Sequence, residues 1–214
     1  MQDNKGASHE IAFWKQFIQS DRFINGWLSN DKTPELNDLV YMFLLGQPEA
    51  KVLDCGSGVV SILHGTVPKE NLTACDLLGT QYDKIFDYEK HGLMCPAPVA
   101  CENIPFDSVF DIVHISNAID HVQDPFKAYA AMLRAVKPGG FLVVQGFVNE
   151  GTHENWEGFH GFDFNLTVHG GLIGQNQKEV VLWVEDNTYF SRKIHIEMLN
   201  REWFIHITRK PLEV

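Results

Sequence analysis

In the first part of the chain, apolar residues follow two patterns that alternate. Short apolar runs predict buried strands, and longer stretches with apolar residues three or four positions apart predict helices. The predicted strands are residues 51–55, 71–76, 99–101, 110–115 and 141–144. The predicted helices are residues 8–29, 35–45, 81–91 and 125–136, and a further helix begins near residue 59. Strands that alternate with helices indicate an α/β fold with a doubly wound, largely parallel sheet.

The pattern changes after residue 145. Residues 149–164 are rich in glycine, aromatic residues, asparagine and histidine, which is typical of a functional loop or a short helix. Two late apolar runs, residues 180–184 and 203–207, predict two further strands. The segment between these two strands is too short to predict a complete helical crossover.

A glycine-rich turn follows the first predicted strand, which ends in the sequence DCGSG at residues 54–58. Glycine tolerates backbone conformations and close approaches that a Cβ atom would forbid. If a helix begins at Val59, its first N–H groups face the turn and form a pocket for an anionic group. Ser61 stands where a dinucleotide-binding turn has its third glycine, so an ordinary strand-to-helix turn remains an alternative.

Polar residues also mark the ends of the other predicted strands. Ligands of doubly wound sheets bind outside the carboxyl ends of the strands. The residues at those ends are 54–58, Asp76, Cys101 with Glu102, and Ser116 to His121. We therefore expect the functional site at this edge of the sheet.

The composition narrows the classes of function. Apolar residues make up 44% of the 214 residues, enough for a full core. The net charge of −11, with 17 basic and 28 acidic residues, argues against a nucleic-acid partner. We expect no membrane span and no signal peptide, because no apolar run is long enough and the first residues lack the basic-then-apolar order. The four cysteines form no Cys-x-x-Cys pair, which favours free thiols in a reducing cytoplasm.

Four segments follow one another in a characteristic order and spacing. They are VLDCGSG at 52–58, ACD at 74–76, CENIPFDSVFDIVHISNAIDHVQDP at 101–125 and LRAVKPGGFLVV at 133–144. This set resembles the class I S-adenosylmethionine-dependent methyltransferases over about residues 50–145. The resemblance implies a Rossmann-like sheet of seven strands, mainly parallel, with an antiparallel last strand and N-terminal helices. Residues 149–164 also resemble a bacterial subgroup associated with glycan-type substrates.

The resemblance implies a single methyltransferase domain and S-adenosylmethionine as the cofactor. Within residues 1–214 we expect an N-terminal helical lid (1–47), a cofactor-binding core (48–148) and a part with the substrate loop and last strands (149–214). The methionine carboxylate would bind the N–H groups of residues 56–58, with Asp54 near the ammonium group. Asp76 would accept the ribose hydroxyls, although a capping or turn role is its structural alternative.

The cofactor-binding residues implied in this way lie in four groups. They are Asp54, Gly56, Ser57, Gly58, Asp76, Leu77, Cys101, Glu102, Asn103, Ser116, Asn117 and His121. Residues 104–106 would wall the adenine or form a simple hydrophobic turn. Two positions depart from the family pattern. Val60 stands where a third glycine is usual, and Ala100 stands where an acidic residue often contacts the adenine amino group.

Methyl transfer asks little covalent chemistry of the protein, which must align the acceptor atom, the methyl group and the sulfur. An acceptor hydroxyl also needs a base, and histidine suits that role near neutral pH. His160 and His121 are the predicted catalytic residues, each with a packing role as its alternative, and His114 is expected in the sheet core. No histidine spacing matches a strong ligand motif, so we predict no metal, although some relatives hold a divalent cation under the substrate.

The predicted function is methyl transfer from S-adenosylmethionine to an oxygen, less readily a nitrogen, of a small molecule or saccharide. A dinucleotide-dependent oxidoreductase would share the opening strand, the glycine turn and Asp76. The KPGG turn at 137–140 and the incomplete glycine pattern argue against it. A non-catalytic partner subunit with the same fold is a third possibility, with residues 149–164 as its interface. The sequence does not indicate the oligomeric state.

Overall fold

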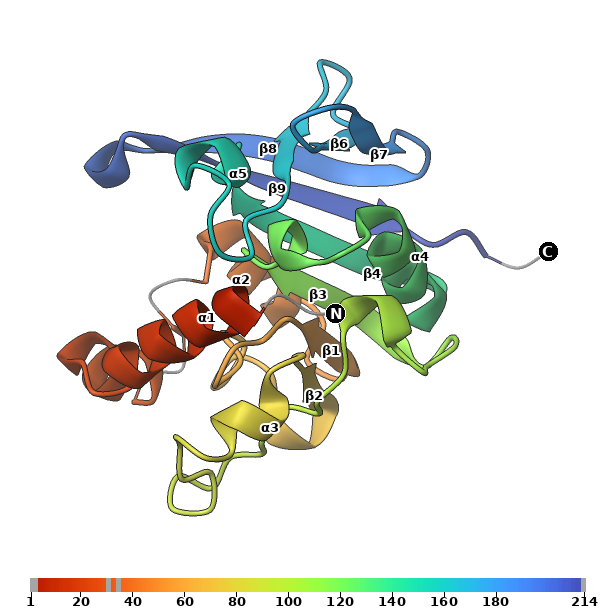
Figure 1. Ribbon diagram of the computed structural model, residues 1–214. Helices are drawn as coiled ribbons and strands as arrows, with labels where there is room; N and C mark the ends of the chain where they lie inside the picture. The colour runs from red at the N-terminus through yellow and green to blue at the C-terminus, as the bar shows by residue number, and fades with distance from the viewer. Residues whose placement is uncertain (1–3, 30–31, 34–35, 213–214) are drawn as a thin grey trace.

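The computed structural model describes residues 4–29, 32–33 and 36–212. Its main sheet has six strands in the order β2-β1-β3-β4-β9-β8 (Figure 1). In chain order the strands are β1 (Val52–Cys55), β2 (Leu72–Cys75), β3 (Phe110–Ser116), β4 (Val136–Phe147), β8 (Thr188–Ile196) and β9 (Arg201–Arg209). Strands β1 to β4 are parallel, and β9 is antiparallel to both of its neighbours. The doubly wound, mainly parallel sheet with an antiparallel last strand is confirmed.

The sheet has one strand fewer than predicted. In place of the strand predicted over residues 99–101, an isolated parallel bridge joins Cys75 to Ala97, and Cys101–Asn103 forms a 3-10 turn. Two prolines, Pro96 and Pro98, flank that bridge. A proline has no N–H to donate to a strand ladder, which explains why the pairing stops after one residue.

One face of the main sheet is covered by α4 (Pro125–Ala135) and by a second, smaller sheet. The small sheet is antiparallel and consists of β5 (Asp163–Leu166), β6 (Leu172–Gln175) and β7 (Val180–Val184). Met132 of α4, Leu172 of β6 and Phe204 of β9 belong to one buried core. The two late strands are confirmed, although β7 lies in the small sheet.

The opposite face is covered by α2 (Asp38–Leu45), whose apolar side packs against alternate residues of the strands. The core on this face includes Val40, Leu44, Val52, Ile112, Val143 and Ile205. The side-chain oxygen of Asn37 accepts the N–H of Leu39 at the start of α2, and Gly46 caps its end as predicted. Glu35, where we expected this helix to begin, lies outside the described residues.

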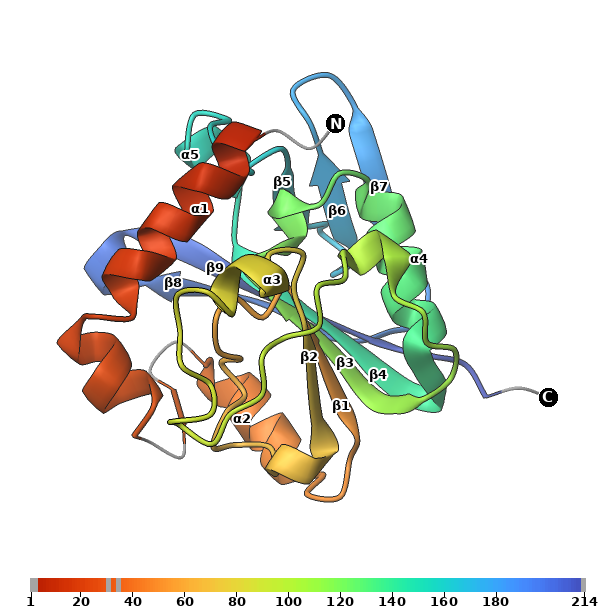
Figure 2. The ribbon, with the colours of Figure 1, turned by 60° about the horizontal axis from the view of Figure 1, so that its bottom comes forward.

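The N-terminal part covers the carboxyl ends of β1 and β2. The single helix predicted over residues 8–29 is split into α1 (Asn4–Phe17) and a π-helical segment (Arg22–Trp27). The Ser20 hydroxyl donates to the carbonyl of Phe17 and accepts the N–H of Phe23, which ends one helix and starts the next. In both views α1 lies between α3 (Gly79–Tyr82) and α5 (Glu150–His153) (Figures 1 and 2). No helix within the described residues is both long and apolar enough to cross a lipid bilayer.

Two predicted helices differ in the structure, and the one expected from residue 59 is absent because two of its carbonyls bond to side chains of a distant segment. The carbonyls of Ser61 and Ile62 accept from the Trp27 indole at 3.4 Å and from the Thr33 hydroxyl at 2.9 Å. Residues 59–66 therefore form a series of turns. The helix predicted over residues 81–91 shortens to α3 and further turns.

The main sheet holds a buried chain of hydrogen bonds that crosses four strands. The Trp203 indole donates to the side-chain oxygen of Gln145 at 3.1 Å, and the Gln145 amide nitrogen lies 2.8 Å from Nε2 of His114. Nδ1 of His114 lies 2.7 Å from Oδ1 of Asp54, and the Ser61 hydroxyl donates to the other oxygen of Asp54 at 2.5 Å. Because an indole only donates, it fixes the Gln145 amide, whose N–H then donates to Nε2 of His114. His114 therefore carries its proton on Nδ1 and donates it to Asp54.

We predict that His114→Leu lowers the free energy of unfolding by about 3–5 kcal/mol, because it leaves the buried Asp54 and Gln145 side chains without their shared partner. Urea unfolding followed by circular dichroism measures the change. Lys193→Ala is the control, because it removes an ion pair at 3.9 Å whose side chains are 39% and 48% exposed. The control should cost about 1 kcal/mol or less. An equally small loss of unfolding free energy in both variants would contradict a stabilising role for the buried hydrogen bonds.

Candidate active site

A cavity of about 340 Å³ lies at the carboxyl ends of the parallel strands. Its walls include Gly56 after β1, Asp76 after β2, and Ala118 and His121 after β3. The predicted site residues on its walls are Gly56, Asp76, Leu77, Cys101, Glu102, Asn103 and His121. The cavity therefore lies where the parallel topology predicts a ligand site.

Asp76 is a firmly positioned charged group of this cavity. Its two carboxylate oxygens accept the N–H of Gly58 at 3.0 Å and the N–H of Leu78 at 2.8 Å. Burial raises the pKa of Asp76 to about 6, the two N–H groups oppose this shift, and the nearby Glu10 adds to it. Among the described residues, no lysine or arginine forms an ion pair with Asp76. The carboxylate keeps lone pairs for hydroxyl donors of a ligand.

The glycine turn does not present the N–H groups that we predicted. The N–H of Ser57 donates to the carbonyl of Cys75 at 3.2 Å, and that of Gly58 donates to Asp76. No helix follows the turn, so the predicted helix N-terminus is also absent. Of residues 56–58, Gly56 alone lines the cavity. In this structure the N–H groups of Ser57 and Gly58 thus have protein partners, and the carboxylate cradle stays a prediction.

Asp54 does not lie on the cavity wall, because both of its oxygens are bonded to His114 and Ser61 in the buried chain. Its role toward an ammonium group stays a prediction, which this geometry does not support. His114 is fully buried in the sheet, as expected.

Three other predicted positions also lie outside the cavity walls. Asn117 has a positive φ of 47°, and its N–H donates to the carbonyl of Gln145 at 2.9 Å. Ser116 pairs with Gln145 at the end of the β3–β4 ladder. Ile104, expected at the adenine, is in the core with 1% of its surface exposed. These residues shape the edge of the sheet without facing the cavity.

Several residues of the cavity were not predicted. They include Glu10, Leu78, Tyr82, Ala118, Lys127 and Phe159. Glu10 comes from α1, where its carboxylate accepts the indole N–H of Trp14 at 2.8 Å. Burial and the charge of Asp76 hold the pKa of Tyr82 well above its usual range. The spacing of Glu10 and Trp14 indicates one helix face, but no local signal tells where that face docks.

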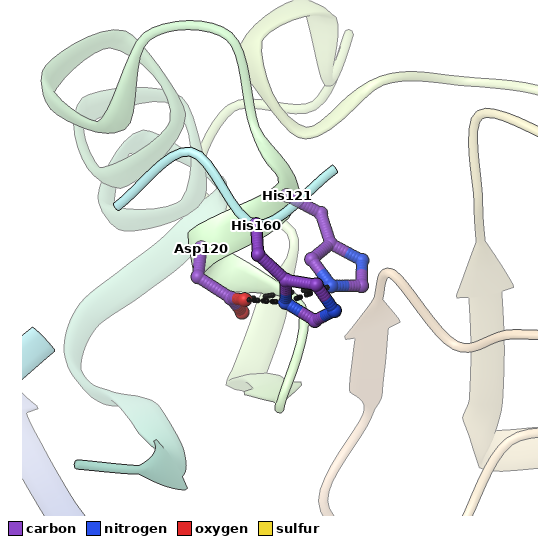
Figure 3. A group of neighbouring side chains, drawn as sticks. All are labelled: Asp120, His121 and His160. Atoms are coloured by element: carbon purple, nitrogen blue, oxygen red, sulfur yellow. Dashed lines mark hydrogen bonds and ion pairs between the residues drawn. The ribbon is translucent and has the colours of Figure 1, made fainter. Parts of the chain in front are cut away.

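The structure brings both predicted catalytic histidines together with Asp120 (Figure 3). Nδ1 of His160 lies 2.7 Å from Oδ2 of Asp120, and Nε2 of His121 lies 3.1 Å from the same Nδ1. The distance from Nε2 of His121 to Oδ2 of Asp120 is 3.4 Å. Burial raises the pKa of Asp120, but the two histidines outweigh it and hold this pKa below the usual value. Burial lowers the pKa of His160, and Asp120 outweighs it, so the net shift is upward.

The loop that carries His160 is fastened to the rest of the protein at several points. The N–H of Gly161 donates to the carbonyl of Asp120 at 3.0 Å. The N–H of Thr152 donates to Asp163 at 2.8 Å, and Glu150 forms an ion pair with Arg201 of β9. These contacts fix residues 150–163 beside the end of β3. The side chain of His160 therefore reaches the Asp120–His121 turn from a segment 39 residues further along the chain.

Comparison with known proteins agrees with this geometry. A family model described as a methyltransferase domain matches residues 53–144, the span that carries β1 to β4 and the cavity residues between them. Over these residues, the chain matches the class I S-adenosylmethionine-dependent methyltransferases. The cofactor of this family is S-adenosylmethionine.

The individual relatives match only in part. The chain is 27% identical over 143 residues to the ubiquinone/menaquinone biosynthesis C-methyltransferase UbiE of Vibrio parahaemolyticus, covering 62% of this chain and 55% of that protein. A protein of the same name from Shewanella piezotolerans is 32% identical over 110 residues, which cover 47% and 44% of the two chains. The chain thus spans about half the length or less of these curated relatives.

Solved structures show the same fold at low sequence identity. The N-methyltransferase NodS of Bradyrhizobium japonicum WM9 has a TM-score of 0.55 at 13% identity, covering 81% of this chain and 93% of that one. The [4+2]-cyclase SpnF has a TM-score of 0.57 at 14% identity, covering 97% and 95%. Because these neighbours are named for different activities, the fold alone does not fix the reaction.

The cavity fits the chemistry of S-adenosylmethionine, the cofactor of the matched family. The anionic Asp76, which has no cationic partner among the described residues, suits the two hydroxyls of a ribose. Leu77, Leu78 and Cys101 provide apolar wall beside it, as an adenine ring requires. Glu10, Glu102 and Asp124 are further acidic residues on the same cavity, and each could face an ammonium group. At the predicted methionine end, Glu10 lies on the cavity wall and Asp54 does not.

We predict that Gly58→Ala loosens the docking of α1. Gly58 has a φ of +66°, and a Cβ atom there would overlap the Trp14 indole. Gly92→Ala is the matched control, because Gly92 has a φ of +65° and open space around it. Both variants carry the same backbone strain, so Gly58→Ala should lose about 1–3 kcal/mol more in urea unfolding, the cost of overpacking. A shift of tryptophan fluorescence should accompany this loss, and equal costs without a shift would contradict it.

Proposed function

We propose that this protein transfers the methyl group of S-adenosylmethionine to a small-molecule or saccharide acceptor, at an oxygen in preference to a nitrogen. The observation that carries the proposal is the shared cavity of Asp76 and His121. Asp76 is a fixed acceptor for ribose hydroxyls, and His121 belongs to a polar cluster at another wall of the same space. A donor site and an acceptor site within one cavity are what methyl transfer requires.

The roles of the chain's residues follow from their positions. Asp76 accepts the ribose hydroxyls, Glu10 receives the ammonium group, and Leu77 faces the adenine. When bound, the cofactor supplies a methyl group already activated by a positively charged sulfur. The protein must then hold the acceptor atom in line with the methyl group and the sulfur, which is worth roughly 7–11 kcal/mol of the barrier.

The preference for oxygen rests on the cluster of Asp120, His121 and His160. An acceptor hydroxyl must lose its proton during the transfer, whereas a neutral amine already offers a lone pair. His121 lines the cavity, and His160 and Asp120 stand directly behind it. A polar cluster of this kind is useful chiefly to an acceptor that must be deprotonated. The named relatives act on carbon and on nitrogen, and they leave the acceptor atom of this chain open. A cytoplasmic location stays a prediction.

We predict that the protein binds S-adenosylhomocysteine in isothermal titration calorimetry and does not bind NADH. Asp76→Asn should weaken this binding by about 1–3 kcal/mol, or roughly 5–150-fold, because charge-assisted hydrogen bonds to the ribose are lost. Asp186→Asn, in an exposed turn far from the cavity, is the matched control. Binding of NADH alone would favour an oxidoreductase.

The same protein should convert S-adenosylmethionine to S-adenosylhomocysteine with some member of a panel of hydroxy acids, phenols, saccharides and amines. Turnover with amines only would contradict the preference for oxygen. Cofactor binding without turnover across the panel would favour a non-catalytic partner subunit.

The affinity for S-adenosylhomocysteine should also fall in acid. The pKa of Asp76 is about 6 without ligand, and ribose hydroxyls favour its charged form, so the bound pKa is lower. Affinity is therefore nearly complete at pH 7 and above and is lost as the pH falls through 6, by about tenfold between pH 7 and pH 5. Glu10, Tyr82 and His121 also face this carboxylate.

Calorimetry from pH 5 to pH 8 measures this effect, and Asp76→Asn should remove the step. The His121→Gln variant should keep it. A step that disappears in His121→Gln but persists in Asp76→Asn would assign the titration to the histidine instead.

A further inference from the structure

We propose that Asp120, His121 and His160 bind a divalent transition-metal cation beside the cofactor cavity. Oδ2 of Asp120, Nε2 of His121 and Nδ1 of His160 point toward one another (Figure 3). Their mutual distances are 2.7, 3.1 and 3.4 Å. Each residue contributes one ligand atom, and the three atoms form a compact triangle.

The size of this triangle matches a coordination face. Cations such as Zn²⁺ lie about 2.0–2.2 Å from histidine nitrogen and carboxylate oxygen. Ligand atoms at that distance are separated by about 3.0 Å in octahedral geometry and about 3.4 Å in tetrahedral geometry. The three observed distances bracket the octahedral value and reach the tetrahedral one. A cation bound on this face would keep further positions for water or an acceptor.

Hydrogen bonds alone do not satisfy the cluster. A ring nitrogen carries either one proton or one lone pair in the ring plane, so it serves one hydrogen bond. Nδ1 of His160 nevertheless lies within bonding distance of both Asp120 and His121. If Nδ1 of His160 donates its proton to Asp120, this nitrogen has no lone pair left to accept a hydrogen bond from Nε2 of His121. The remaining contact of Nε2 within the triangle is then the long 3.4 Å contact to Asp120. A cation between the three atoms accepts a lone pair from each.

The surrounding charge also favours a cation. The side chain of Asp120 is 5% exposed, and its ionic partners among the described residues are the two imidazoles. Neutral imidazoles leave the carboxylate charge uncompensated, which is costly in a buried position. Glu10 and Asp76 add negative charge to the same cavity, where Lys127 is the basic residue with a full charge.

The ligand set selects the kind of ion. Two imidazoles and one carboxylate suit Zn²⁺, Co²⁺, Ni²⁺ or Fe²⁺, whereas Mg²⁺ prefers oxygen ligands. Binding of the ion stands on the geometry alone, but its role rests on the proposed function. A cation there would hold the acceptor oxygen and lower the pKa of its hydroxyl. The hydroxyl proton leaves to water, the oxygen bonds to the methyl carbon, and the carbon–sulfur bond breaks to give S-adenosylhomocysteine.

Calorimetry with Co²⁺ and with Zn²⁺ on protein freed of metal by a chelator tests the site. One equivalent of either ion should bind, Co²⁺ should gain visible absorption bands, and Mg²⁺ should bind far more weakly. Asp120→Asn and His160→Gln should weaken Co²⁺ binding by more than the roughly 10–100-fold that loss of an outer-shell partner costs. His153→Gln is the matched control, because this exposed histidine of the neighbouring turn lies outside the triangle. It should bind Co²⁺ as the wild type does.

Absence of Co²⁺ and Zn²⁺ binding, or equal binding by the Asp120→Asn and His160→Gln variants, would overturn the site. S-adenosylhomocysteine titration of each variant checks that it is folded. If a variant fails this check, broadening of the His121 and His160 imidazole resonances by Co²⁺ in the wild type decides the question. Protein that binds Co²⁺ but not S-adenosylhomocysteine keeps the metal site and loses the proposed function. Protein that binds S-adenosylhomocysteine but not Co²⁺ would contradict the metal site and leave the proposed function intact.

Discussion

The arrangement of the sheet depends on a buried chain of hydrogen bonds that permits one pattern of protons. The Trp203 indole can only donate, so it orients Gln145, which in turn leaves His114 with its proton on Nδ1 toward Asp54. The four residues lie on β9, β4, β3 and β1. A slip of one residue in any of these strands would turn its polar group to the other face and leave its neighbour unpaired in the core. These buried hydrogen bonds therefore fix the register of the four strands. The register sets where the strands end, and the cavity lies at those ends.

A second constraint joins the fold to the site. Asp76 receives the N–H of Gly58, so the carboxylate that faces the cavity also ties the end of β2 to the turn after β1. Trp14 of α1 packs over the same glycine, and Glu10, one turn earlier, reaches the cavity wall. The same packing of α1 on the glycine turn thus both closes the cavity and positions its acidic groups. This arrangement explains how a turn without a following helix can still form a ligand site.

The parts of the fold that sequence could predict are those with complete local signals. The helix α4 has Asp124 as its N-cap and Pro125 at its first position, and the structure has it over nearly the predicted residues. The strands β1 and β3 are apolar runs buried on both faces. The helix expected after residue 59 fails because Trp27 and Thr33, from a distant segment, bond to its carbonyls. Such long-range competition has no signature within the segment itself.

Within the site, the same distinction separates Asp76 from Asp54. Both follow an apolar strand and look alike in sequence, but Asp54 lies opposite His114, a residue 60 positions away in the chain. That pairing occupies both the side chain of Asp54 and its place in the sheet, whereas Asp76 directly follows β2, the strand next to β1, and lies on the cavity wall. A strand-end carboxylate is therefore available to a ligand only when the neighbouring strand does not offer it a buried partner.

The Asp120, His121 and His160 cluster shows how a tertiary contact changes the meaning of a residue. Each histidine taken alone resembles a general base, because the sequence does not show that His160 comes together with Asp120 and His121. The structure turns one nitrogen of each ring toward Asp120, and the lone pairs of those nitrogens can serve a proton or a cation but not both. The same imidazole nitrogens can therefore act either as a general base or as metal ligands, but not as both at once. Which state the protein uses depends on whether one buried carboxylate and two partly buried imidazoles are satisfied more completely by shared protons or by one ion, and the proton count of this triangle favours the ion.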